Sequence, residues 1–360
     1  MEALMNVGSN GAGLRILIVR VGAMGDVLHG MPAVAALRTA LPDAVIGWAV
    51  EPRWAPLLSA GAGAAAQPLI DTVHRVEAKA WSKHPVSRET FCSIRDLRQE
   101  LRAQRYDLAI DLQGSIRSAL IARASGASRV VGSTSPRESP ARWLYTQRVP
   151  IGSRHVIEQA AEIVSVATQQ QLAPATALLP VDAAAEAWCE TFLVSDPRPA
   201  VFLAPTAGWG AKQWPAERYG RLAQQLFERG CRVLVNASPH GTDRVADAVV
   251  QHSGGTAAAA ACTLSQLIAL LRRVRLVVAG DSGPLHLAAA LGVPVVALFG
   301  PTDPVRNGPY ATTAVVLRHA SSQTDHRRHA HGEAGLQQIA VAEVLAAALQ
   351  QLSASTPAHG

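Results

Sequence analysis

The sequence predicts an α/β protein with two Rossmann-like domains that face each other across a cleft. Strand-like and helix-like segments alternate along the chain, which is typical of parallel sheets covered by helices. The alternation is interrupted by the proline-containing segment LAPATALLPVD at 172–182, which is the best candidate for a linker. A chain of 360 residues, of which 49% are hydrophobic, can bury two cores, because single cores rarely grow beyond about 250 residues.

The same pattern places the domains and their strands. We expect a flexible tail at 1–14, an N-terminal domain at 15–175, a C-terminal domain at 176–333, and a final helix at 334–352 that packs back across the domains. The expected strands lie at 15–20, 45–51, 106–113, 129–133, 199–205, 231–238, 275–281 and 293–300. Because ligands of open parallel sheets bind beyond the carboxyl ends of the strands, functional residues are expected at the strand-to-helix turns.

Composition and charge exclude several classes of protein. No apolar run approaches the roughly 20 residues that span a bilayer, and the first residues lack the pattern of a signal peptide, so we expect a cytoplasmic protein. The four cysteines are scattered without CxxC spacing, which fits neither a disulfide scaffold nor a zinc site. A net charge of +6 favours an acidic ligand or an anionic membrane surface. Nucleic acid is not expected, because aromatic residues are few and no recognition module is present.

The turn after the first expected strand reads GAMGD and places Gly25 and Asp26 at the start of an amphipathic helix. Asp is a common helix N-cap, so one interpretation of Asp26 is that it only caps this helix. However, the stretch is not GxGxxG, and a carboxylate here would repel a pyrophosphate bound at the same turn. The residues therefore favour an acceptor hydroxyl, rather than a phosphate, beside Asp26.

Two turns of the second half indicate an anion site. In AGDSGPLHL, Asp281 ends a strand, Ser282 and Gly283 offer free backbone amides at a helix start, and His286 lies in the first turn. Such a helix start attracts anions. In PTAGWGAK, Thr206 and Lys212 follow another strand, and the lysine can supply a point charge for phosphate.

Polar residues also follow two strands of the first half. Gln113, Gly114 and Arg117 lie after one, and Arg137, Glu138 and Arg142 after the next. Taken singly they are typical of a solvated charged loop, and as a group they suit an acidic acceptor. The tract holding His319, His326, His329 and His331 is expected to be a mobile loop, and no metal is assigned to it. The chain contains no Asp-x-Asp pair, so no metal ion is expected.

Four motifs occur in a specific order: RVGAMGDVLHGMPAVAALR, YDLAIDLQGSIRSAL, KQWPAERY and DSGPLHLAAALGVPVVALFGPTDP. From about residue 15 to 352 the chain therefore resembles the ADP-heptose:lipopolysaccharide heptosyltransferases of glycosyltransferase family 9. The resemblance implies the B-type glycosyltransferase fold and metal-independent, inverting transfer of heptose from ADP-heptose, without a cofactor. It also implies a lipid A-Kdo type acceptor on the cytoplasmic face of the inner membrane, where the protein would be peripheral.

The resemblance also implies residue roles. Asp26 matches the proposed general base, and Asp281 matches the residue that binds the sugar hydroxyls. The amides around Ser282 and Gly283, with His286 and Lys212, would stabilise the departing diphosphate. Gly25, Gln113, Arg117, Arg137 and Glu138 would bind the acceptor. The chain departs from the family after the strand at 231–238, where it reads Pro239-His240-Gly241-Thr242-Asp243, so Asp243 is offered as a substitute acid for the ribose. The 137–138 pair is more similar to enzymes that add the first heptose to Kdo than to those that add the second, and both acceptors stay open.

Two other classes of protein are compatible with two such domains. An NAD(P)-dependent oxidoreductase would need GxGxxG after a strand; Glu51 ends the second strand where a ribose-binding acid belongs, but the glycine pattern is missing. A non-catalytic nucleotide-sugar or glycan-binding protein would share the anion site. The role of Asp26 separates that binding protein from an enzyme.

Overall fold

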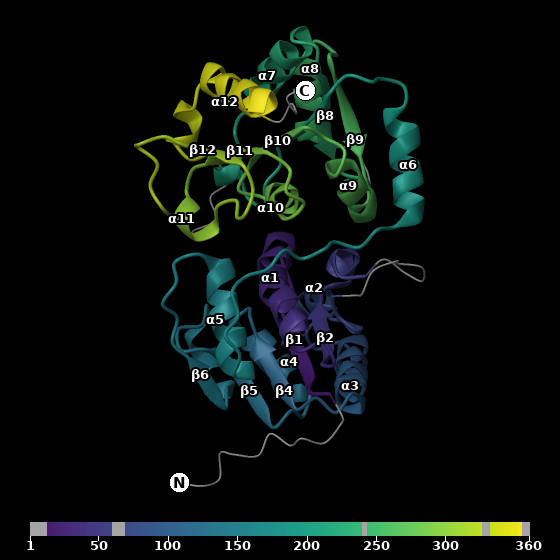
Figure 1. Ribbon diagram of the computed structural model, residues 1–360, viewed down its shortest axis with the longest axis vertical. Coiled ribbons are helices and arrows are strands. Elements are labelled where there is room, and N and C mark those ends of the chain that lie inside the picture. Colours follow the sequence, from purple (N-terminus) through teal and green to yellow (C-terminus); the bar gives the residue numbers. More distant parts are fainter. Residues whose placement is uncertain (1–12, 60–68, 240–242, 326–331, 355–360) are drawn as a thin grey trace.

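The computed structural model describes residues 13–59, 69–239, 243–325 and 332–354. Within them the chain forms two six-stranded parallel sheets, each covered by helices on both faces (Figure 1). The prediction of two Rossmann-like domains is therefore confirmed. Nearly all of the predicted tail at 1–14 lies outside the described residues.

The first sheet has the strand order β3-β2-β1-β4-β5-β6. Its strands are β1 (Arg15–Val19), β2 (Val45–Val50), β3 (Thr72–Arg75), β4 (Leu108–Asp111), β5 (Arg129–Ser133) and β6 (Gln147–Val149). One face packs against α1 (Met24–Ala40), α5 (Val156–Thr168) and the 3-10 helix η1 (Pro52–Leu57). The other packs against α2 (Ala78–Lys83), α3 (Arg88–Ala103), α4 (Ile116–Ala124) and the 3-10 helix η2 (Ser139–Leu144). The central strands are apolar because helices bury both faces.

The second sheet has the order β12-β11-β10-β7-β8-β9. Its strands are β7 (Ala200–Ala204), β8 (Arg232–Ala237), β9 (Ala257–Ala261), β10 (Leu276–Gly280), β11 (Val295–Phe299) and β12 (Ala314–Arg318). The helices α7 (Ala216–Glu228), α8 (Arg244–His252) and α12 (Val341–Ala354) cover one face. On the other side lie α6 (Ala183–Leu193), α9 (Leu264–Leu271) and α10 (Gly283–Ala290). Shorter turns are η3 (Gly210–Lys212), α11 (Pro304–Asn307) and η4 (Leu336–Gln338).

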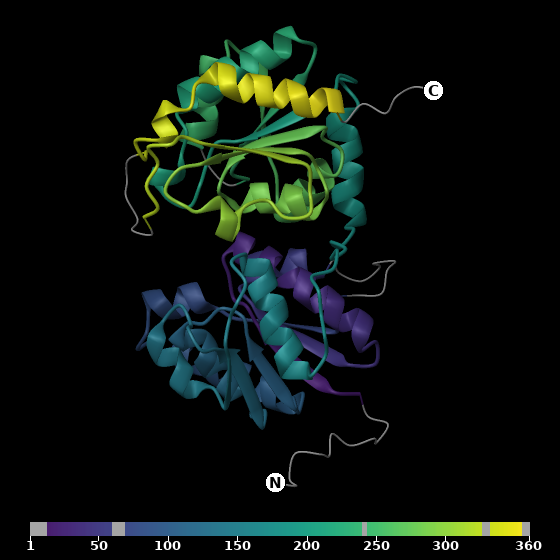
Figure 2. The ribbon, with the colours of Figure 1, turned by 60° about the vertical axis from the view of Figure 1, so that its left-hand side comes forward.

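One hydrophobic core is continuous between the two sheets, because α1 packs on the first sheet and also against α10 of the second domain. For this reason α1 is buried at ten of its 17 positions and is not the amphipathic helix that the sequence suggested. The segment 172–182 contains no helix or strand, as expected of the linker, and Figure 2 shows it running from α5 to α6 between the domains.

The final helix differs from its prediction. We expected it to pack across the domains, but α12 packs on α7, β10, β11 and β12, all of the second domain. Figures 1 and 2 show it on the outer side of that domain. Its apolar face, which includes Val344 and Ala348, is already covered by the second core, so nothing draws it toward the first. No helix among the described residues is long and apolar enough to cross a membrane.

Candidate active site between the domains

The amino-terminal ends of α1 and α10 meet where the two domains touch. A Cβ atom on Gly25 would lie 2.7 Å from Cδ2 of His286, and one on Gly283 would overlap the side chain of Met24. Both glycines are therefore needed for close approach. Because each helix start carries a partial positive charge, two of them together favour negative charge at this place.

Three predicted donor residues, Asp281, Lys212 and His286, are joined by polar contacts at the start of α10. Asp281 Oδ2 lies 2.5 Å from Lys212 Nζ, and Asp281 Oδ1 lies 2.9 Å from His286 Nε2. Burial alone would raise the pKa of the Asp281 carboxyl, but the hydrogen bond and charge of His286 and the cation of Lys212 together hold this pKa well below its usual range. Asp281 is therefore a buried carboxylate that fixes both neighbouring side chains.

Ser282 precedes α10 without capping it. Its Oγ is buried and has no hydrogen-bond partner among the described residues. Buried hydroxyls are normally hydrogen-bonded, so this one is poised for a ligand or a water molecule. Thr206 is partly buried in the loop between β7 and η3.

Asp243 has a structural role. One of its oxygens accepts hydrogen bonds from the backbone amides of Val245 and Ala246, and the other accepts one from the amide of Ser238. Asp243 is thus the N-cap of α8. Both oxygens are engaged, which leaves less capacity for the ribose than the sequence suggested. The neighbouring residues 240–242 lie outside the described residues.

Asp26 is not the N-cap that its position in the sequence suggested. The helix α1 begins at Met24, so the N-cap is Ala23 and Asp26 is the third helical residue. One carboxylate oxygen accepts a hydrogen bond from the Ala23 amide at 3.0 Å, and the other pairs with Arg20 Nη2 at 3.0 Å. The helix starts earlier because Met24 and Gly25 pack against α10. The side chain keeps 37% of its surface exposed.

That exposed part of Asp26 lies in the wall of a cavity of about 830 Å³ in the first domain. Four of the predicted acceptor residues line the same cavity: Gln113, Arg117, Arg137 and Glu138. Gly25 does not; it makes room for His286 instead. The structure thus brings the candidate base and the predicted acceptor group together, although they come from three separate turns of the sheet.

The cavity residues hold one another in place. Gln113 Oε1 accepts hydrogen bonds from the amides of Val21 and Gly22 at 2.7 and 3.3 Å, which fixes the loop before α1. Arg117 donates to Ser82 Oγ at 2.7 Å, and Glu138 accepts from the Ile116 amide at 2.9 Å. The Arg137 side chain makes no such contact among the described residues and is free to meet a ligand.

Sequence reasoning missed two site residues. Arg20 binds the Asp26 carboxylate, and His29 approaches His286 with their ring nitrogens 3.2 Å apart. Burial, followed by the charges of His286 and Arg20, lowers the pKa of His29 well below 6.5. His29 follows Asp26 by three residues, and this spacing places both on one side of a helix. The spacing could therefore have pointed to His29 from the sequence.

Two residues that the sequence analysis singled out, Arg142 and His319, lie away from this centre. Arg142 stacks on Trp143 outside the cavity wall. His319 bonds to Ser321 at the surface, and His326, His329 and His331 lie outside the described residues. Among the described residues no group of His, Cys, Asp or Glu could hold a metal ion, and all four cysteines are free thiols.

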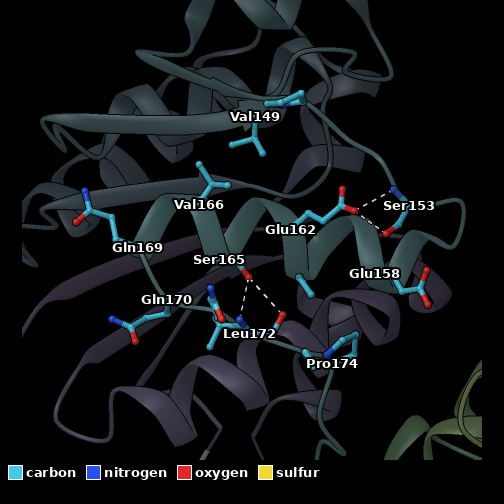
Figure 3. A pocket seen from close by; sticks show the side chains of 14 residues that line it. Val149, Ser153, Glu158, Glu162, Ser165, Val166, Gln169, Gln170, Leu172 and Pro174 are labelled. Carbon is cyan, nitrogen blue, oxygen red and sulfur yellow. Dashed lines mark hydrogen bonds between the residues drawn. The ribbon is translucent and has the colours of Figure 1, made fainter.

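A second cavity, of about 770 Å³, lies between α5 and the residues that follow it (Figure 3). Two polar pairs lie within its wall: Glu162 binds Ser153, and Ser165 binds the backbone of Leu172. None of the predicted site residues lines it.

Comparison with known proteins decides the family. A family model described as glycosyltransferase family 9 (heptosyltransferase) matches residues 94–335. The chain belongs to glycosyltransferase family 9. Lipopolysaccharide heptosyltransferase 1 of Pseudomonas aeruginosa is 30% identical to this family 9 chain over 312 residues, which cover 84% of this chain and 83% of the relative.

Two solved structures of family relatives share the fold. The Escherichia coli heptosyltransferase WaaC with ADP superposes with a TM-score of 0.74 and 25% identity, covering 95% of this chain and all of that one. WaaC with ADP-2-deoxy-2-fluoro heptose gives a TM-score of 0.72 at 25% identity and the same coverage. This family 9 chain therefore has the two-domain architecture of WaaC.

Proposed function

We propose that the protein is an inverting, metal-independent transferase that moves heptose from ADP-heptose to the inner core of lipopolysaccharide. Residues 15–175 would bind the acceptor and 176–333 the donor. The observation that carries the proposal is the position of Asp26, which lines the predicted acceptor cavity while its helix abuts the anion site around His286. The WaaC complexes with ADP and an ADP-heptose analogue support this choice of donor.

The proposed reaction uses that geometry. Asp26 accepts the proton of the acceptor hydroxyl as its oxygen attacks the anomeric carbon of the heptose. The new carbon–oxygen bond forms opposite the bond to ADP, which breaks, so the configuration at that carbon inverts. The Arg20 guanidinium and the Ala23 amide hold the carboxylate in one orientation. A fixed base avoids the reorganisation that a mobile one would need.

Fixed donors are proposed to stabilise the negative charge that develops on the departing ADP. Lys212 supplies a cation at the start of α10, and His286 and the amides around Ser282 and Gly283 are the proposed hydrogen-bond donors; Ser282 Oγ is unpaired among the described residues. Asp281 orients Lys212 and His286 and is also proposed to bind the sugar hydroxyls. Because these donors are preorganised, they stabilise the developing charge without a divalent ion.

The acceptor is proposed to be a Kdo-bearing lipid A, with a heptose acceptor as the alternative. Arg117 and Arg137 line the acceptor cavity, and guanidinium groups suit carboxylates such as that of an acidic sugar. Such an acceptor places the protein at the cytoplasmic face of the inner membrane.

The test is to incubate the protein with ADP-heptose, ADP-glucose, UDP-glucose or GDP-mannose, each with Kdo-lipid A, and to measure nucleotide release and the glycosylated product. The proposal predicts a product with ADP-heptose and the opposite anomeric configuration to the donor. Nucleotide binding without product from any donor would favour a non-catalytic binding protein instead.

A further inference from the structure

The net charge of the chain is concentrated in one segment. Residues 78–143 contain 12 of the 33 Lys and Arg residues and 6 of the 27 Asp and Glu residues. Their net charge of +6 equals that of the whole chain, so the rest of the sequence is balanced. This segment contains α2, α3, α4 and η2, which form the helical layer on one face of the first sheet, together with the strands β4 and β5.

The same layer exposes apolar side chains. Six of the twelve large apolar residues exposed among the described residues belong to it: Val86, Phe91, Ile94, Ile116, Leu120 and Trp143. We call their common surface the α3–α4 face. Phe91 and Trp143 are 62% and 71% exposed. Single exposed apolar residues are ordinary, but a contiguous set beside basic residues marks an interaction surface.

Two observations place these residues on one surface. Ile94 and Arg98 of α3 and Leu120 of α4 line the same cavity, so the two helices present their apolar stripes to a common groove. The 3-10 helix η2, which carries Trp143, packs against α4. The groove is the cavity that also contains Asp26. The α3–α4 face therefore borders the proposed acceptor site.

We propose that the α3–α4 face docks on an anionic lipid bilayer. The exposed cations beside the apolar residues include Lys79, Lys83, Arg88, Arg123 and Arg142. Basic side chains with interleaved aromatic and aliphatic residues suit an anionic surface, because the charges meet lipid headgroups while the apolar groups enter the interface. Each basic residue near such a surface strengthens binding roughly fivefold. In this arrangement a membrane-anchored acceptor enters the cavity without leaving the bilayer, and in this respect the inference rests on the proposed function.

The test uses sedimentation of the full-length protein with vesicles, without any donor. We expect it to bind vesicles of phosphatidylglycerol and phosphatidylcholine at least about tenfold more tightly than vesicles of phosphatidylcholine alone, and to be released by salt. The variant Phe91→Ser/Trp143→Ser should weaken binding about tenfold. The charge variant Lys83→Gln/Arg88→Gln/Arg123→Gln should weaken it at least as much. None of these residues lines the cavity.

The control variant is Leu178→Ser/Val194→Ser, which removes two equally exposed apolar residues outside the face and should bind like the wild type. Melting temperatures of all variants confirm folding, as expected for exposed positions. Equal binding to both vesicle types, no binding to either, or equal losses in the control and face variants would overturn the proposal. Transfer to a water-soluble Kdo acceptor is measured in parallel: vesicle binding without transfer refutes the proposed function alone, and transfer without vesicle binding refutes only the docking.

Discussion

His29 of α1 and His286 of α10 lie with Nε2 and Nδ1 3.2 Å apart, although 257 positions separate them in the chain. His286 Nε2 contacts Asp281 Oδ1, and Asp281 Oδ2 accepts a hydrogen bond from Lys212 Nζ. A single chain of polar contacts thus joins the first domain to the candidate anion site of the second. The position of His286 therefore depends on how the domains meet.

The burial of His29 predicts a pH-dependent stability. Its pKa in the folded protein lies well below 6.5, because burial and the charges of His286, Arg20 and His155 all lower it. The Asp281 carboxylate raises this pKa, but by less. As the pH falls below about 6.5, the unfolded chain takes up this proton first, so stability is lost. His29→Gln, which keeps a donor toward His286, should flatten the loss by up to about 1.4 kcal/mol per pH unit. Urea unfolding between neutral and mildly acidic pH measures this; equal slopes for both proteins would contradict it.

Gly25 should be sensitive to the smallest added side chain. In Gly25→Ala the new methyl group meets His286, which is held by hydrogen bonds on both ring nitrogens. Displacing His286 should reduce transfer about 10- to 100-fold, because small misplacements near a reacting centre are costly. Gly208→Ala is the matched control, since nothing lies within 4 Å of its added Cβ. Similar rates for both variants would show that the contact is unimportant.

Lys212 should contribute to ADP binding. Lys212→Ala removes the cation beside Asp281, so the protein should lose up to about 3 kcal/mol of stability. More specifically, the rise in melting temperature caused by ADP should shrink, because binding to the native state stabilises it by mass action. Each variant is compared with itself without ADP, and Arg221→Ala, which breaks an exposed ion pair on α7, serves as the control. An undiminished ADP response in Lys212→Ala would remove Lys212 from the phosphate site.

Turnover should continue in excess EDTA. The chain has no Asp-x-Asp pair, and Lys212 with the amino end of α10 can carry the phosphate charge in place of a cation. Initial rates with and without EDTA measure this directly. Loss of transfer that magnesium or manganese restores would contradict the prediction.

The strands that the sequence predicts and those that it does not predict differ in their position within the sheets. Buried, β-branched runs such as those of β1 and β10 identify the central strands. The strands that sequence reasoning missed, β3, β6, β9 and β12, are the four edges of the two sheets. Edge strands are less completely buried and lack a strong apolar signal. The strand β9 is five alanines, a composition that favours a helix locally and becomes a strand only by pairing with β8.

Prediction of the site residues from the sequence has a similar limit. Asp26, Lys212, Asp281 and His286 could be proposed from the sequence because each follows a strand within a recognisable turn. Arg20 and His29 were missed because their roles depend on contacts that form only when α1 is in place. The capping role of Asp243 was also missed, since a single sequence does not distinguish a carboxylate that caps a helix from one that faces a ligand.

The most direct measurement is made on Asp26→Asn. Asparagine keeps the oxygen that can accept the Ala23 hydrogen bond, so the fold and the ADP response should persist, but it cannot take the acceptor's proton. If Asp26 is the general base, the mutant should melt within a few degrees of the wild type, still respond to ADP, and transfer heptose to Kdo-lipid A about 100-fold more slowly or worse. Transfer at nearly the wild-type rate would contradict it and leave Asp26 with only its structural role at the start of α1.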